Sequence, residues 1–182
     1  MEPIDSPSAN PSSMTTRSAG IRYGMIGGVI SIAYFLILIL AGVNMTSGYW
    51  NWIGYAITAG LIFMAHKYYK ENGNGFMSYG QGIGISFWLG LISAAISSVF
   101  TYIYVKFIDS SFVEMIKEKQ LEEMEGRGMS SEQIDQAMKF ASMFTSPEAI
   151  FLFGLLGGIV VTIIIALLVT IFTQKKAPEP TF

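Results

Sequence analysis

The chain has 182 residues, of which 52% are hydrophobic and 13% are charged, whereas soluble globular domains carry about 25% charged residues. The formal net charge of −2, with no basic cluster larger than Lys175 and Lys176, argues against nucleic acid as a partner. Because the chain has no cysteine and a single histidine, His66, we expect no disulfide, metal site, cofactor or catalytic triad, and no enzyme.

The N-terminal part of the chain predicts a tail followed by two membrane crossings. Residues 1–20 are rich in Pro, Ser and Thr, which predicts a disordered tail. From Tyr23 to Ala65 there is no Asp, Glu, Lys or Arg. As a helix this run would reach roughly 65 Å, twice the roughly 30 Å hydrocarbon core, so it predicts crossings at about 23–43 and 50–66. A cleaved signal peptide is the alternative for the first crossing, although its apolar run is longer than such peptides have.

The predicted crossing at about 50–66 has the weakest apolar character, and a re-entrant segment is its alternative. Its edges support a full crossing, because Trp50 and Trp52 form an aromatic belt at one end and Lys67 and Lys70 a basic anchor at the other. The turn before it contains Asn44-Met45-Thr46, an N-glycosylation pattern that we interpret as chance because so short a loop lies against the membrane.

The rest of the chain predicts two further crossings with a polar segment between them. The third crossing is expected at about 80–105 and the fourth at about 150–172, followed by a short tail at 177–182. Between them, residues 110–146 predict an extramembrane helical hairpin whose apolar stripes pack on each other or on the membrane surface. Residues 21–176 thus form one membrane domain.

Local signals define the two helices of the predicted hairpin. Ser111 with Glu114 fits a capping box, and Ser130 with Gln133 fits a second one. The first helix is expected to stop at Gly126 and the second before Pro147.

Charge predicts the orientation. The hairpin segment carries five basic residues against nine acidic ones, a net charge of −4, whereas basic residues lie close to the first, second and fourth crossings. The positive-inside rule therefore favours both termini in the cytoplasm.

Small residues recur every four positions through the third predicted crossing. They are Gly82, Ser86, Gly90, Ala94 and Ser98, and Gly154 and Gly158 have the same spacing in the fourth crossing. Such a stripe predicts a helix-packing face. It packs within the same bundle, forms the seam of a homodimer, or lines a ligand or lipid groove.

Three polar residues are predicted at the membrane interface. Gln81 and Tyr79 are expected at the headgroup level at the start of the third crossing, where Gln81 satisfies the helix start. His66, beside Lys67 at a helix end, is expected to be an interfacial anchor, with a proton relay as the alternative. No Asp, Glu, Lys or Arg lies inside any predicted crossing, which weighs against ion-coupled transport.

The string Asn74-Gly75-Phe76-Met77-Ser78-Tyr79-Gly80-Gln81-Gly82 is followed by Gly128-Met129-Ser130-Ser131-Glu132-Gln133-Ile134 and by Ser146-Pro147. With these motifs the chain resembles the bacterial membrane-protein family catalogued as domain of unknown function 4199, from about Ser18 to Lys176. The resemblance implies a four-crossing protein of the bacterial inner membrane. It implies no assigned activity, cofactor or catalytic residue.

The sequence therefore predicts an all-α integral membrane protein with four transmembrane helices and an extramembrane helical hairpin between the third and fourth. Our functional hypothesis is a structural or accessory subunit that meets a second copy or another membrane protein through helix packing or the hairpin. The alternative is a small transporter or lipid-handling protein for an apolar or neutral ligand. A continuous polar cavity lined by Gln81, Ser86, Ser93 and Ser97 would favour transport, and a tightly filled bundle would favour the accessory role.

Overall fold

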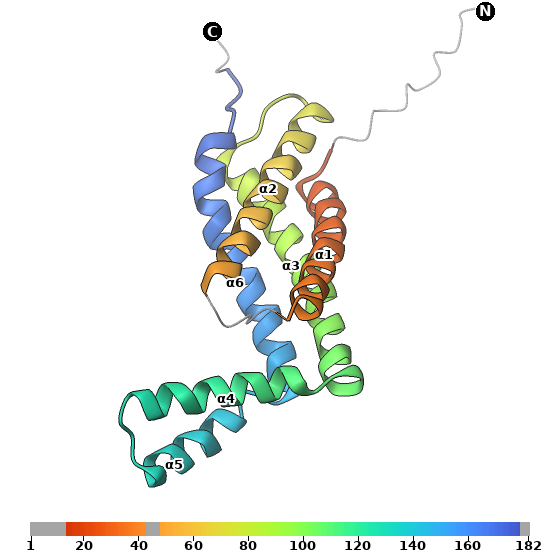
Figure 1. Ribbon diagram of the computed structural model, residues 1–182. Helices are drawn as coiled ribbons and strands as arrows, with labels where there is room; N and C mark the ends of the chain where they lie inside the picture. Colours follow the sequence, from red (N-terminus) through yellow and green to blue (C-terminus); the bar gives the residue numbers. More distant parts are fainter. Residues whose placement is uncertain (1–13, 43–47, 179–182) are drawn as a thin grey trace, which may run out of the picture.

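The computed structural model describes residues 14–42 and 48–178 (Figure 1). These residues form six α-helices and a short π-helix, with no strand beyond one isolated bridge between Met77 and Lys175. The helices are α1 (Thr16–Leu40), α2 (Gly48–Glu71), α3 (Tyr79–Ile103), η1 (Tyr104–Ile108, the π-helix), α4 (Ser111–Gly126), α5 (Ser131–Ser142) and α6 (Pro147–Thr173). The predicted all-α class is confirmed for the described residues.

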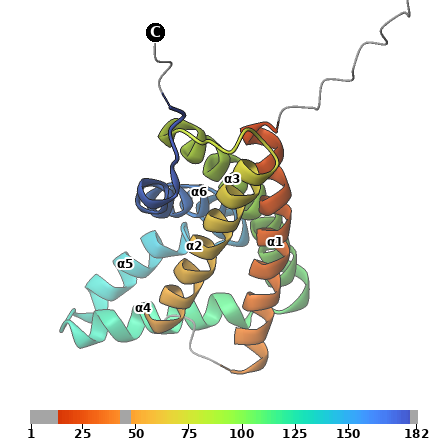
Figure 2. The ribbon, with the colours of Figure 1, turned by 90° about the horizontal axis from the view of Figure 1, so that it is seen from above.

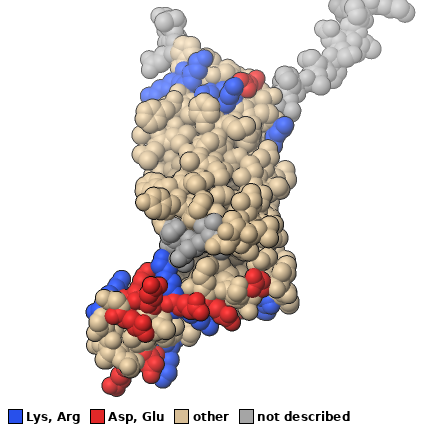
Figure 3. All heavy atoms as spheres, in the orientation of Figure 1, with Lys and Arg blue, Asp and Glu red and all other residues tan. Residues whose placement is uncertain are grey.

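Three of the described helices are long and apolar enough to cross a membrane. They are α1 with 25 residues, α3 continued through η1 with 30 residues, and α6 with 27 residues. At about 1.5 Å per residue even α1 reaches about 37 Å, more than the roughly 30 Å hydrocarbon core. Figure 3 shows an uncharged band on one face of the bundle, with mostly basic residues at one end and mixed charges at the other. The apolar helices thus indicate a membrane location.

Helix α3 is the centre of the bundle, with α1 on one side and α6 on another, while α2 lies beside them (Figures 1 and 2). Glycines on α1 allow its close approach to α3. A Cβ added at Gly24 would lie 2.8 Å from Ile92 Cβ, and one added at Gly28 would lie 2.8 Å from Ile96 Cβ. Real Cβ atoms do not pack so closely, so larger residues at these positions would push the two helices apart.

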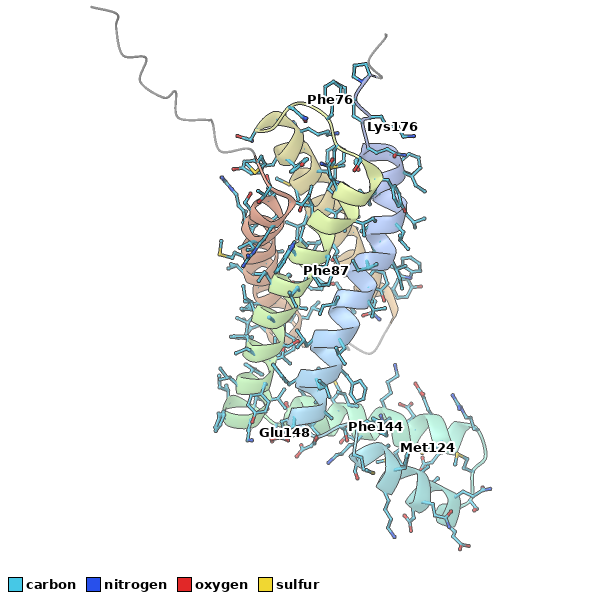
Figure 4. All side chains as sticks on the ribbon, turned by 180° about the vertical axis from the view of Figure 1, so that it is seen from behind. Phe76, Phe87, Met124, Phe144, Glu148 and Lys176 are labelled. Atoms are coloured by element: carbon cyan, nitrogen blue, oxygen red, sulfur yellow. The ribbon has the colours of Figure 1, made fainter. Side chains whose placement is uncertain are left out.

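The two ends of the bundle are held by different contacts. At one end the backbones of Met77 and Lys175 exchange two N–H···O bonds of 2.8 Å, which tie the loop before α3 to the residues after α6. At the other end Lys106 Nζ lies 2.7 Å from Glu148 Oε1, joining η1 to the first turn of α6. Figure 4 shows Phe76 and Lys176 at the first end and Glu148 at the second.

Helices α4 and α5 lie across the second end of the bundle and extend to one side (Figure 1). They pack against each other, and neither contains a buried residue. The side chains of Phe140 and Met143 are 65% and 69% exposed. Phe144 contacts Phe140 and also Phe153 of α6, with ring centroids 5.1 and 5.6 Å apart. The α4 and α5 pair therefore contacts the bundle mainly where it adjoins η1 and α6.

The observed ends of α4 and α5 can be compared with the predicted ones. The Ser130 and Gln133 capping box is confirmed, and α4 ends at Gly126 as predicted. The Ser111 and Glu114 box is wrong, because Ser110 is the N-cap and the Asp109 carboxylate accepts the Ser111 N–H at 2.9 Å. The hydrogen bonds from Ser111 to this exposed carboxylate hold the pKa of Asp109 below its usual value.

The first helix begins earlier than the sequence predicts. A capping box between Thr15 and Ser18 starts α1 at Thr16, so residues 16–20 are helical and do not belong to the predicted disordered tail. The error has a local cause, because a serine replaces the usual Glu or Gln at the fourth position of this box. The predicted Asn44-Met45-Thr46 pattern lies outside the described residues.

Candidate functional site: a buried histidine and an uncharged pocket

The small-residue stripe of α3 packs against α6 of the same chain. A Cβ added at Gly82 would lie 2.5 Å from Thr170 Cγ2, and one at Gly90 would lie 2.9 Å from Thr162 Cβ. Further along the two helices, Ala94 faces Gly158 and Ser98 faces Gly154. Gly82, Ser86, Gly90, Ala94 and Ser98 are all buried. This face is occupied within the chain, so a homodimer would have to use another surface.

His66 of α2 is buried at one end of this packed seam, with 0% of its surface exposed. Its Nε2 lies 2.9 Å from the Gly82 carbonyl oxygen and 3.2 Å from Ser86 Oγ, and its Nδ1 lies 2.7 Å from Thr173 Oγ1. Because a carbonyl oxygen only accepts, Nε2 carries a proton and donates it to Gly82. The ring therefore joins α2, α3 and α6.

The sequence predicts that His66 anchors the chain at the membrane interface, but the side chain points into the bundle and not outward to the headgroups. The outward position is taken by its neighbours, because Lys67 is largely exposed and forms an ion pair with Glu71 at 3.7 Å. Lys70 Nζ donates to the Thr173 carbonyl oxygen at 2.8 Å, satisfying the end of α6. Position along the helix alone does not show which side chain meets a neighbouring helix.

Gln81 and Tyr79 complete the start of α3. The Gln81 Oε1 accepts the Ser78 N–H at 2.8 Å and the Ser78 Oγ accepts the Gln81 N–H at 3.2 Å, which is a capping box. The Tyr79 hydroxyl donates to the Leu167 carbonyl oxygen at 3.1 Å and links α3 to α6. Both side chains therefore have structural partners of their own.

A separate polar pocket of about 230 Å³ lies between α1, α2, α3 and α6. Its hydroxyl and amide groups come from Ser31, Tyr34, Asn51, Thr58, Ser93, Ser97 and Thr162. Trp50 and Tyr55 add aromatic rings, and no charged residue is among the described residues that line it. In a bundle with an uncharged outer surface, so many convergent polar groups are typical of a ligand site.

The pocket has a closed inner end. It continues into a narrower space of about 50 Å³ that reaches Ile57, Leu61 and Leu89. Leu61 and Leu89 are 7% and 1% exposed, and His66 and Ser86 lie beyond them along α2 and α3. Neither Gln81 nor Ser86 lines the pocket. Of the four residues whose common cavity would favour transport, Ser93 and Ser97 border this pocket, and Leu61 and Leu89 separate it from Ser86.

The pocket exists because α2 packs closely through only one of its halves. All buried residues of α2 lie between Leu61 and Tyr69, and none lies between Gly48 and Gly60. The Tyr34 hydroxyl of α1 reaches across the space between α1 and the first half of α2 and donates to the Trp50 carbonyl oxygen at 2.7 Å. The open half of α2 thus forms one wall of the pocket.

Among the lining residues, the sequence indicated Ser93 and Ser97 as polar groups of a cavity, and Trp50, Ala94 and Gly158 only for other roles. Thr162 carried a usable signal, because it continues the four-residue spacing of Gly154 and Gly158. Ser31, Tyr34 and Thr58 carried none, since single hydroxyl residues are ordinary in membrane helices. Which of them face a common space depends on how far α2 diverges from its neighbours.

The described residues form an all-helical fold with three helices long and apolar enough to cross a membrane, a buried polar seam and a pocket with an uncharged described lining. The chain belongs to the family described as "Protein of unknown function (DUF4199)", whose model matches residues 22–175. This confirms the family resemblance that the sequence motifs indicate. Neither the curated proteins nor the solved structures gave a match to the chain.

Proposed function

We propose that this protein crosses the membrane four times and binds a small uncharged molecule in the pocket between α1, α2, α3 and α6, without catalysis. The supporting observation is the pocket itself, in which polar groups from four helices converge without a charged residue. Polar groups are costly at membrane depth and are kept mainly where they serve packing or a ligand. Thr162 belongs both to the α3 to α6 seam and to the pocket wall, whereas the pocket hydroxyls of α1 and α2 lie outside that seam and line open space.

Binding fits the geometry better than transport does. A transported molecule would have to pass from the pocket to the opposite end of the bundle, and Leu61 with Leu89 closes that path. The next polar group beyond them, His66, has both ring nitrogens engaged. Of the two roles named in the alternative hypothesis, lipid handling is therefore favoured over transport.

The proposal counts α2 as a membrane crossing in addition to α1, α3 and α6. Its 24 residues reach about 36 Å, enough for the hydrocarbon core, and it runs between the same two ends as α1 (Figures 1 and 2). Its apolar content is lower because one face lines the pocket. The basic end of the bundle, where the described part of the chain begins and ends, would lie in the cytoplasm of a bacterial inner membrane. The pocket and the α4 and α5 pair would then lie toward the outer side.

The accessory role remains a second candidate because α4 and α5 carry apolar side chains without intrachain cover. Phe140 of α5 and Met143, which follows the last residue of α5, are exposed beside Phe144. A membrane partner that contacts this edge would bury them. Its test is native pull-down in mild detergent: a stoichiometric partner should be lost on Phe140→Ser with Met143→Ser, and be kept on Lys139→Ser.

A cysteine-free chain allows a direct test of the pocket. Ser97→Cys, which lines the pocket, should react with a charged, membrane-impermeant methanethiosulfonate reagent added from outside. Ser98→Cys is the matched control, because Ser98 is 4% exposed and packs on Gly154. Equal protection of the two cysteines from both sides of the membrane would contradict an accessible pocket.

Occupancy is tested by filling the pocket. Gly54 lines it, and a Cβ added there meets nothing closer than Tyr34 Cε1 at 4.0 Å, so Gly54→Leu projects into open space. Gly60→Leu is the control, because no atom lies within 4 Å of a Cβ at that position on the same helix. Mass spectrometry of extracts from purified protein should find an uncharged compound with the wild type and Gly60→Leu but not with Gly54→Leu. The same compounds in all three samples would contradict the proposal.

A further inference from the structure

We infer that the pocket recognises a neutral polyhydroxyl group, a sugar or polyol that is free in solution or is the headgroup of a lipid. The inference rests on the proposed binding function and adds the chemical class of the ligand. Four properties of the lining carry it: the absence of charge, the direction of its hydroxyl hydrogen bonds, its aromatic rings, and its size and level in the bundle.

The absence of charge excludes ionised ligands. The described lining contains no Lys, Arg, Asp or Glu, so a phosphate, carboxylate or ammonium group bound there would lose its hydration without gaining a counter-charge. At the opposite end of the bundle, Lys67, Lys70 and Lys175, together with Glu71, line a separate depression. Anionic headgroups have that end available and no partner in the pocket.

Three hydroxyls of the lining, those of Thr58, Ser97 and Thr162, are placed to act as acceptors. Thr58 donates its own proton to the Gly54 carbonyl oxygen at 2.9 Å, and Thr162 donates to the Gly158 carbonyl oxygen at 2.8 Å. Ser97 donates to the Ala94 carbonyl oxygen at 3.3 Å. With their protons engaged, these oxygens offer lone pairs to the pocket. A ligand with several O–H donors on one small framework satisfies such a set.

Aromatic rings accompany the acceptors. Tyr34, Trp50 and Tyr55 line the same pocket and provide flat apolar surfaces with a polar edge. The C–H faces of a sugar ring stack on such surfaces while its hydroxyls reach the surrounding oxygens. Asn51 adds an amide that both donates and accepts, as alternating hydroxyl groups require.

Size and position favour a single small ring or polyol. The volume of about 230 Å³ is below the roughly 300–1,000 Å³ of sites for drug-sized ligands. The mouth includes Trp50 in the first turn of α2, beside the exposed Tyr49 and Trp52. Exposed Trp and Tyr residues gather at the level of lipid headgroups. A headgroup sugar or a dissolved one reaches the pocket from this level.

The test uses the full chain in phosphatidylcholine nanodiscs, with Trp50 fluorescence and the thermal unfolding midpoint as readouts. One arm adds monoglucosyl diacylglycerol to the disc, a second adds glucose, galactose, inositol or glycerol to the buffer, and a third adds phosphatidylserine. We expect a saturable change in at least one of the first two arms and none in the third. A response to the glycolipid alone identifies a headgroup, and a response to a free compound identifies a dissolved ligand.

Variants place the response in the pocket. Gly54→Leu should weaken it at least tenfold and Gly60→Leu should leave it unchanged, while Trp50→Phe should remove the fluorescence change. Thr58→Val deletes one acceptor with little change in shape and should also weaken the response. It replaces Gly54→Leu in the test if that variant fails to fold. The inference is overturned if no neutral probe acts, if phosphatidylserine acts equally, or if the folded pocket variants respond like the wild type. If Ser97→Cys is reactive but no neutral probe acts, the ligand class is wrong and the pocket stands.

Discussion

His66 Nδ1 lies 2.7 Å from Thr173 Oγ1, so a histidine of α2 is joined to the last residue of α6 across 107 positions of sequence. The opposite ring nitrogen reaches the Gly82 carbonyl oxygen of α3. One side chain thus connects three helices at the end of the bundle where α2 packs closely. The other half of α2, which lacks such a link, borders the pocket.

Replacing His66 should therefore destabilise the bundle. His66→Ala removes both contacts and leaves a small cavity, and we expect a loss of about 1–3 kcal/mol in the free energy of unfolding. Thermal or SDS unfolding in mild detergent measures the loss. Lys67→Ala is the control, because the Lys67 side chain, next to His66 in sequence, is exposed and its ion pair with Glu71 contributes little to stability. Equal stability of the two variants would contradict a linking role for His66.

The α3 to α6 seam should not tolerate larger side chains. Gly90→Ala places a methyl group 2.9 Å from Thr162 Cβ, and overpacking of this kind costs about 1–3 kcal/mol. Gly157→Ala is the comparison, since no atom lies within 4 Å of a Cβ there and alanine favours the helix by up to about 1 kcal/mol. The two variants should shift the unfolding midpoint in opposite directions. A shift of the same sign and size would contradict the close approach at Gly90.

Opening the apolar layer should join the pocket to the histidine region. Leu61→Ala deletes most of a buried side chain and should cost about 2–5 kcal/mol. In the same background, Ser86→Cys should become reactive to the impermeant thiol reagent, whereas with Leu61 intact it should be protected. Ser86→Cys that reacts already with Leu61 in place would show that the layer does not close the pocket.

The Tyr34 hydroxyl should hold the open half of α2 in place. Tyr34→Phe removes its bond to the Trp50 carbonyl oxygen and should cost about 0.5–1.5 kcal/mol. The rate at which Ser97→Cys is labelled should rise as α2 moves outward. Tyr55→Phe, which also lines the pocket, is the control and should leave that rate unchanged.

The start of α4 should depend on pH through Asp109. Since the pKa of this carboxyl is lowered in the folded chain by bonds from Ser111, its stabilising effect is present above the unfolded pKa of about 4. The effect should be lost as the pH falls from about 4 through the lower folded value. The Ser111 amide signal in NMR should follow this titration, and Asp109→Asn should abolish it. A midpoint at or above pH 4 would contradict the hydrogen-bonded carboxylate.

Much of the helical order could be predicted from local signals. The apolar runs predicted α1, α3 and α6, because only a helix satisfies every backbone group within a membrane-length segment. The Ser130 and Gln133 box was right because its partners are three residues apart. The Ser111 box failed because Asp109, two residues earlier, competes for the same amide.

The sequence by itself determined that this is an all-helical chain with membrane-length apolar helices, and its motifs indicated the family. It also showed that α3 carries a packing stripe, since four-residue spacing places small residues on one face. The tertiary structure alone decided what that stripe meets, that His66 points inward, and that Ser93 and Ser97 border a pocket whose inner end is closed. Those outcomes depend on how α2 is rotated and how far it diverges from the neighbouring helices. Contacts between residues far apart in sequence determine both.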